Sequence, residues 1–161
     1  MMLPFQVTMI PLFVIFSKVN LIDTILPLVL PTFFGDAFFI FLLRQFFLSI
    51  PHELREAAVI DGANHFDIYS RIVMPLARPA LATVIIFSFL WTYTDFQGPL
   101  IYLTSEDHFT LSLGLRGFFA AHGAQWNYMM AASFLFTLPV VILFFFAQRT
   151  FIEGIVTTGL K

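Results

Sequence analysis

The sequence has 161 residues, of which 59% are hydrophobic and 11% are charged, and its mean hydropathy is +0.89. Soluble domains carry about 25% charged residues, so this composition excludes an ordinary water-soluble domain and predicts a helical membrane protein. The formal net charge of −2 and the absence of a basic patch argue against nucleic-acid binding. With no cysteine, disulfides and thiolate chemistry are excluded.

Four apolar segments separated by polar stretches predict an all-α, polytopic membrane protein that forms a single domain. The segments cover residues of about 1–17, 25–47, 79–102 and 128–147. The first would rise about 25 Å as a helix, short of a hydrocarbon thickness of roughly 30 Å. It has no positively charged start and no cleavage site, so it is not a signal peptide. We therefore expect further residues upstream of Met1.

The distribution of Lys and Arg predicts the orientation, because cytoplasmic loops carry an excess of these residues. Two positive residues follow the last segment, and four flank or lie in the polar stretch 49–78. These six residues are Arg44, Arg55, Arg71, Arg78, Arg149 and Lys161. Only Lys18 and Arg116 lie on the opposite side. The stretch 49–78 and the C-terminus are therefore predicted to be cytoplasmic.

The stretch 49–78 predicts two short helices joined by a glycine turn. Pro51 suits a first helical turn, with Ser49 as the cap. Gly62 stands where a helix often ends in a left-handed residue. Asn64 is placed to cap the second helix.

The first of these helices has a small, shallow face formed by Leu54, Ala57 and Ala58, with Asp61 at its end. Such a face suits insertion into a groove of a partner protein, and the alternative is a helix lying on the membrane surface. In the second helix an apolar stripe is expected, and Pro75 is expected to stop the helix. The stripe contains Phe66, Tyr69 and Val73, with Ile72 beside it.

Glu56-Ala57-Ala58, Gly62 and Ile72-Val73-Met74-Pro75 resemble the EAA loop of ABC importer permeases. That pattern is Glu-Ala-Ala, three residues, Gly, nine residues, Ile, one residue and Leu-Pro, and this sequence meets every spacing. The departure is Met74 where the pattern has Leu, a conservative apolar exchange. The flanks resemble the carbohydrate-uptake branch of the family, in particular the second subunit of maltose-type permeases. These flanks include residues 41–47, 79–82, 131–133 and 159–161.

The resemblance implies that separate ATPase subunits dock on the loop and that residues 56–62 form the coupling helix. The residues expected to carry this coupling are Glu56, Ala57, Ala58, Asp61, Gly62 and Pro75. A second permease subunit, giving a heterodimer, and an extracytoplasmic solute-binding protein are the other implied partners, in a bacterial or archaeal plasma membrane. Such permeases usually have six spans, and this chain matches the last four.

No Gly-x-x-x-x-Gly-Lys-Ser/Thr phosphate loop occurs in the sequence. ATP and Mg²⁺ are therefore expected on the partner ATPase subunits, and this chain is expected to have no cofactor, no metal and no catalytic residue. The membrane subunit is predicted to be a permease and not an enzyme.

The substrate path has two tentative components. Asp36 lies about 12 Å along a helix from Arg44, and a carboxyl group at that depth faces protein or water. It either lines the path or makes a buried structural hydrogen bond. The second component combines aromatic rings with groups that pair with hydroxyls, which suits a sugar, and its alternative is the interfacial end of a span. It contains Trp91, Tyr93, Thr94, Asp95 and Gln97.

Two alternative functional classes are a zinc enzyme and a transporter or channel subunit that works without ATPase partners. His52-Glu53-Leu54-Arg55-Glu56 is close to the zinc pattern His-Glu-x-x-His, but Glu56 replaces the second histidine and His65 has the wrong spacing. A secondary transporter or channel subunit without ATPase partners would be expected to show paired charges within the membrane. Only Asp36 and Asp95 are candidates for such charges.

Overall fold

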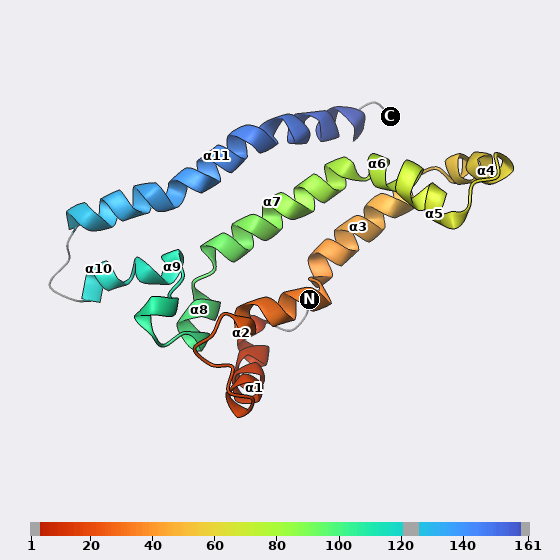
Figure 1. Ribbon diagram of the computed structural model, residues 1–161. Coiled ribbons are helices and arrows are strands. Elements are labelled where there is room, and N and C mark those ends of the chain that lie inside the picture. Colours follow the sequence, from red (N-terminus) through yellow and green to blue (C-terminus); the bar gives the residue numbers. More distant parts are fainter. Residues whose placement is uncertain (1–3, 121–125, 159–161) are drawn as a thin grey trace. The chain divides into compact units, whose positions relative to one another are not determined.

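The computed structural model describes residues 4–120 and 126–158, and every regular element in these ranges is a helix (Figure 1). This confirms the predicted all-α class. The chain divides into two compact units, one of residues 1–36 and 89–144 and the other of residues 37–88 and 145–161. Residues 1–3 of the first predicted segment and the 159–161 tail lie outside the described residues.

Two stretches are long and apolar enough to cross a membrane, Leu26–Ser49 and Trp126–Gln148. A third qualifies if His65–Leu76 and Arg78–Thr94, which are bent by 66° relative to each other, are counted as one span. The first apolar helix, α1 (Phe5–Lys18), has 14 residues and is shorter. The described residues therefore form a helical, polytopic membrane protein, and the four predicted crossings stay a prediction.

The first unit contains α1 and several short helices that follow it. These are α2 (Leu26–Val29), η1 (Leu30–Phe34), α8 (Gln97–Tyr102), η3 (Glu106–His108), α9 (Leu111–Gly114) and α10 (Gly117–Ala120). Helix α1 ends at Lys18, and Asn20, two residues further on, has a φ of +55°. The N–H groups of Asn20 and Leu21 donate to the carbonyls of Ser17 and Phe16, at 3.1 and 2.9 Å. Asparagine tolerates this left-handed conformation, so it closes the helix where glycine is more common.

Asp23 ties the turn after α1 to the loop after α8. Its carboxylate accepts hydrogen bonds from the N–H groups of Thr104 and Ser105, both at 2.8 Å, and from the Ser105 hydroxyl. His108 Nδ1 lies 3.5 Å from the same carboxylate. The Ser105 hydroxyl and these two N–H groups hold the pKa of Asp23 well below its ordinary value of 3.8.

The end of α7 (Arg78–Thr94) packs on the part of α11 (Trp126–Thr158) that belongs to the first unit. The Tyr93 hydroxyl donates to the Phe136 carbonyl at 3.0 Å. The two rings stack with their centroids 4.7 Å apart, and Phe89 stacks on the other side of Tyr93 at 5.3 Å. Stacked rings and a satisfied hydroxyl make Tyr93 a structural contact between helices.

The third predicted segment, 79–102, is not one continuous helix. Helix α7 ends at Thr94 and α8 begins at Gln97. The Asp95 carboxylate accepts from the Gly98 N–H at 3.1 Å, and this local bond replaces the bonding of a continuing helix. The second predicted segment is also interrupted, because Gly35 has a φ of +77° between η1 and α3 (Ala37–Ser49).

Candidate functional site

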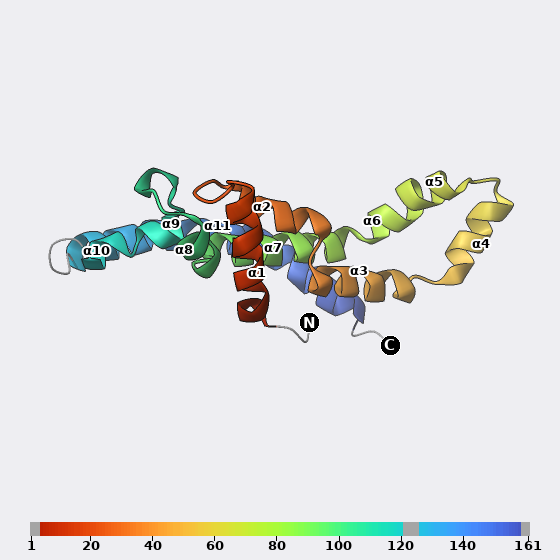
Figure 2. The same ribbon diagram turned by 90° about the horizontal axis from the view of Figure 1, so that it is seen from below.

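The second unit holds the polar stretch that the sequence marks as functional. It follows α3 and consists of α4 (His52–Ile60), α5 (His65–Asp67), the π-helical η2 (Ile68–Val73) and α6 (Met74–Leu76). Figures 1 and 2 show the chain leaving α3, running out along α4 and returning through α5 and α6. The predicted pair of helices is therefore present, and we call residues 49–78 the two-helix loop.

The turn at the tip of the two-helix loop is a complete left-handed helix ending. Gly62 has a φ of +83°. Its N–H donates to the Val59 carbonyl at 3.0 Å, and the Ala63 N–H donates to the Ala58 carbonyl at 2.9 Å. These two bonds are the Schellman pattern that satisfies the last carbonyls of a helix. The predicted role of Gly62 as the residue that ends α4 is confirmed.

Asn64 begins the returning arm as predicted. Its side-chain oxygen accepts from the N–H groups of Phe66 and Asp67, both at 2.9 Å. Asp67 then lies 3.4 Å from Arg71 Nε, one turn further along. Together with the Gly62 turn, this cap fixes the direction in which the chain leaves α4 and returns.

The predicted start of α4 is wrong in one detail. Pro51 directly precedes the helix, and no side chain caps it. Ser49 is the last residue of α3, and its hydroxyl donates back to the Phe46 carbonyl at 2.6 Å. No N–H group of α4 donates to this hydroxyl, so Ser49 does not cap the helix.

The expected stop at Pro75 is also wrong. Pro75 lies in the first turn of α6, which continues to Leu76. Proline is tolerated there because the N–H groups of a first turn have no partner within the helix. The Ala77 N–H donates to the Val73 carbonyl at 2.9 Å, so the helical run continues past the proline.

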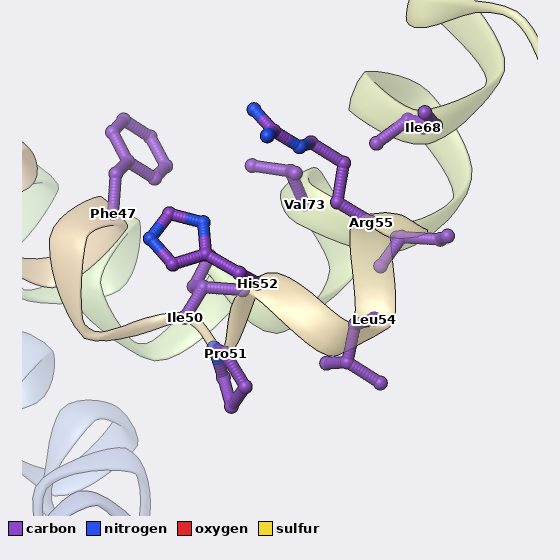
Figure 3. Close-up of a pocket in the computed structure, with 9 residues that line it drawn as sticks. Phe47, Ile50, Pro51, His52, Leu54, Arg55, Ile68 and Val73 are labelled. Atoms are coloured by element: carbon purple, nitrogen blue, oxygen red, sulfur yellow. The ribbon is translucent and has the colours of Figure 1, made fainter. Parts of the chain in front are cut away.

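A small cavity of about 170 Å³ lies inside the two-helix loop, between the end of α3, α4 and η2. Figure 3 shows Phe47 and His52 on one side, Ile68 and Val73 on the other, and the Arg55 side chain between them. Ile68 is buried, with 5% of its surface exposed. The two arms of the loop therefore share a small apolar interior of their own.

The predicted apolar stripe of the returning arm coincides only in part with its buried face, because Val73 lines the cavity but the stripe's other two residues do not. Phe66 and Tyr69 are exposed, at 73% and 52%, whereas Ile68 is buried. The cause is the π-helical turn, in which residues five apart, such as Ile68 and Val73, come to the same side. The ordinary helical spacing therefore groups Val73 with two exposed residues instead of with Ile68.

The two alanines of α4 have different environments. Ala57 is exposed, but Ala58 is only 8% exposed and faces its own loop, where α4 contacts η2. The expectation that both alanines belong to one open face is therefore wrong. The exposed surface beside Ala57 includes Glu56, whose carboxylate has no hydrogen-bond or ion-pair partner among the described residues.

The other residues proposed for coupling lie at the surface of the loop. Asp61, Gly62 and Pro75 are all exposed. Glu56, Ala57, Asp61 and Gly62 are thus accessible along the outer arm and its tip. Ala58 is the interior residue that supports this arm.

The first unit contains a larger cavity, of about 350 Å³, beside the end of α7. Its floor is apolar and is formed by Ile25, Leu28, Val29 and Pro99. Its remaining lining residues carry an aromatic ring, a carboxylate and three hydroxyls; they are Thr32, Trp91, Thr92, Asp95 and Thr110. We call this the Trp91 cavity.

The structure brings only some of the predicted path residues together. Trp91 and Asp95 both line the Trp91 cavity, but Tyr93 bonds to α11 instead. The Gln97 amide nitrogen lies 3.9 Å from the Met9 sulfur, outside the cavity lining. Asp36 is exposed at the break between η1 and α3 and does not line the cavity either.

Three threonines that line the Trp91 cavity were not predicted from the sequence. Thr32 and Thr110 are far from Trp91 along the chain, and no local spacing relates them. They belong to η1 and to the start of α9, so only the tertiary structure brings them to α7. Thr92 is the exception, since its position beside Trp91 was a usable signal.

Gly98 allows the Asp95 carboxylate to approach the start of α8. A Cβ at Gly98 would lie 2.5 Å from Asp95 Oδ2 and 3.2 Å from Leu28 Cδ2. Any larger residue would displace the carboxylate or the Leu28 side chain. Glycine at this position thus keeps Asp95 at the edge of the cavity.

The described residues contain no group of three His, Cys, Asp or Glu side chains that could hold a metal ion. His52 and Glu53 both lie on α4. Nothing in the described part of the chain supports the zinc-enzyme alternative.

Comparison with known proteins identifies the family of the chain and several relatives. Residues 1–156 match the family described as binding-protein-dependent transport system inner membrane component. The chain is 37% identical over its whole length to the arabinooligosaccharides transport system permease proteins AraQ of Halalkalibacterium halodurans and Bacillus subtilis, covering 57% of each. The lactose transport system permease protein LacG of Rhizobium radiobacter is 34% identical over 96% of this chain and 56% of that protein.

The chain thus spans little more than half the length of these curated relatives. The family match covers nearly all of the chain, and all 161 residues of the chain align with part of each AraQ protein. The chain therefore belongs to the family of inner membrane components of binding-protein-dependent transport systems.

Proposed function

We propose that this chain is part of the membrane-spanning permease of an ATP-driven ABC importer for sugars. The observation that carries the proposal is the two-helix loop, in which a short exposed helix ends in a left-handed Gly62 turn and is followed by an Asn64 cap. The loop has the sequence pattern of the EAA loop, and the family match supports a transport role. The names of the AraQ and LacG relatives support a sugar as the substrate.

In the proposed mechanism, α4 docks in a groove of an ATPase subunit and moves with it. The packing of Ala58 and Ile68, together with the Gly62 turn and the Asn64 cap, makes the loop stiff enough to transmit that movement. Closure of the ATPase dimer would then favour one of two arrangements of the membrane helices. ATP and Mg²⁺ bind to the partner subunits.

The proposed assembly has three kinds of partner. ATPase subunits bind the two-helix loop on the cytoplasmic side, a location that the Lys and Arg distribution supports. A second permease subunit completes the translocation path as a heterodimer, and an extracytoplasmic solute-binding protein delivers the sugar. The family description, which names binding-protein-dependent transport, supports the last of these partners.

Substitutions that change the charge of the loop test the proposal. Glu56→Lys and Gly62→Asp are expected to lower ATP-dependent sugar uptake by about tenfold or more, because coupling free energies of 1–3 kcal/mol correspond to about 5–150-fold. The matched control is Glu106→Lys, an exposed charge reversal in the first unit. Uptake of radiolabelled arabinotriose and lactose is measured in proteoliposomes, with membrane insertion checked by immunoblot.

Wild-type uptake in both loop variants would contradict the proposed coupling. Purification of the transporter distinguishes the secondary-transporter alternative, since an ATPase subunit that remains bound supports the importer. Sugar uptake by the purified chain without any ATPase subunit would support the alternative and contradict the proposal.

A further inference from the structure

We infer that the Trp91 cavity is a carbohydrate-binding subsite that this chain itself contributes to the translocation path. The inference rests on the proposed function for the sugar's delivery, but its evidence is separate from the two-helix loop. It depends on the lining and hydrogen bonding of a cavity formed wholly within the first unit.

The shape and composition of the cavity suit one sugar unit. Its volume of about 350 Å³ is at the lower end of the range of roughly 300–1,000 Å³ for small-molecule sites. Such sites combine an apolar lining with a few placed polar groups, as here. Trp91 supplies a flat ring, half exposed, on which the C–H face of a sugar can pack.

Asp95 supplies the strongest hydrogen-bond acceptor in the cavity. Its Oδ1 accepts from the Gly98 N–H at 3.1 Å, which fixes the carboxylate. Its Oδ2 has no hydrogen-bond partner among the described residues. An ionised carboxylate oxygen can accept from sugar hydroxyls, and hydrogen bonds to charged groups are about twice as strong as neutral ones.

The three threonines supply hydroxyl groups around this acceptor. The Thr32 hydroxyl donates to the Val29 carbonyl at 2.7 Å, which leaves its oxygen able to accept. The Thr110 hydroxyl lies 3.0 Å from the Ser112 hydroxyl and caps the start of α9. Both are therefore held in place by the backbone around them. Thr92 adds a third hydroxyl with no described hydrogen-bond partner.

This combination favours a neutral polyhydroxylated ligand over a cation. Asp95 is the one carboxylate in the described lining, and hydroxyls and an aromatic ring make up the rest of its functional groups. A metal cation would need several oxygen ligands arranged around one point. Sugars instead need both donors and acceptors beside an apolar surface, and the cavity has both.

Cysteine protection tests the subsite directly in the complete transporter. The chain has no cysteine, so any thiol label on it reports the introduced residue alone. Thr92→Cys places a thiol in the cavity lining. Thr94→Cys is the matched control on α7, because the Thr94 hydroxyl bonds to the Leu90 carbonyl and does not line the cavity.

The labelling rate with a small methanethiosulfonate reagent is measured with and without arabinotriose or lactose, using whichever sugar the wild-type transporter takes up. We expect the transported sugar to slow labelling of Thr92→Cys several-fold and to leave Thr94→Cys unchanged. Adding Asp95→Asn to Thr92→Cys should raise the sugar concentration needed for half-protection by about tenfold, the loss of one charge-assisted hydrogen bond. Asparagine keeps the acceptor for the Gly98 N–H, so the backbone there stays intact.

If the sugar did not slow the labelling of Thr92→Cys in a transporter that takes up this sugar, the subsite would be overturned and the proposed function would still stand. Equal protection of Thr92→Cys and Thr94→Cys would also overturn it, since the effect would then be a general change of the helix. A wild-type transporter that takes up neither sugar contradicts the sugar-importer function, and with it this subsite.

Discussion

Gly62 shows how one residue sets the shape of the two-helix loop. Its φ of +83° is a backbone conformation that residues with a Cβ rarely adopt, although no atom lies within 4 Å of where that Cβ would be. Gly62→Ala should therefore destabilise the loop through the backbone alone, by about 1–2 kcal/mol. Hydrogen–deuterium exchange of the α4 amides measures this loss.

Gly114 provides the control for Gly62. It also has open space around it, but it lies in α9 without a positive φ. Gly114→Ala should leave its helix as stable as before or stabilise it by up to about 1 kcal/mol. If the two alanine variants changed local exchange to the same extent, the left-handed turn would not be the reason for glycine at Gly62.

Asp23 makes a second prediction at the residue scale, concerning pH. Hydrogen bonds from Ser105 and Thr104 hold its pKa below the ordinary value of 3.8 in the folded protein. Its contribution to stability is therefore complete above that value and is lost as the pH falls through the lower, folded-state pKa. The stability difference between the wild type and Asp23→Asn, measured by thermal unfolding, should shrink as the pH is lowered below 3.8.

Ser105→Ala checks the cause of this effect. It removes the hydroxyl that contributes most to lowering the pKa of Asp23, so that pKa should move back toward 3.8. A carboxyl titration followed by NMR shows the shift. An unchanged Asp23 pKa in this variant would mean that the hydrogen bonds between Asp23 and the loop after α8 do not form as described.

At the scale of elements, the returning arm of the two-helix loop depends on its Asn64 cap. Asn64→Ala should cost about 1 kcal/mol of local stability, whereas Asn64→Asp, which keeps a side-chain acceptor, should cost much less. Limited proteolysis between α4 and α5 reports the difference. Equal cleavage rates in the alanine and aspartate variants would argue against capping as the role of Asn64.

The elements also show what the sequence could and could not predict. The Gly62 turn and the Asn64 cap were predictable because each depends on bonds to residues a few positions away. The buried face of the loop was not, because the π-helical turn of η2 changes the residue spacing and α4 buries Ala58 against its own loop. The break after Thr94 was predictable in principle, since the Asp95 carboxylate accepts from the Gly98 N–H only three residues on.

At the scale of the whole molecule, composition alone was sufficient for the all-α membrane class. The Trp91 cavity was only half predictable, since Trp91 and Asp95 are close in sequence but Thr32 and Thr110 reach the cavity through tertiary contacts. Tyr93 and Gln97, predicted for the path together with them, lie outside this cavity, and their part in the path stays a prediction. Sequence proximity therefore located the region of the cavity without defining its lining.

The central claim, that α4 docks on an ATPase subunit, is tested most directly by cross-linking. Ala57→Cys places a thiol on the exposed face of α4, and Ala58→Cys, one residue along the same helix, places it in the loop interior. With a short reagent that couples to the introduced thiol and photochemically inserts into neighbouring protein in the assembled transporter, Ala57→Cys should cross-link to the ATPase subunit and Ala58→Cys should not. Absence of a cross-link at Ala57→Cys, or equal cross-linking at both positions, would contradict the account.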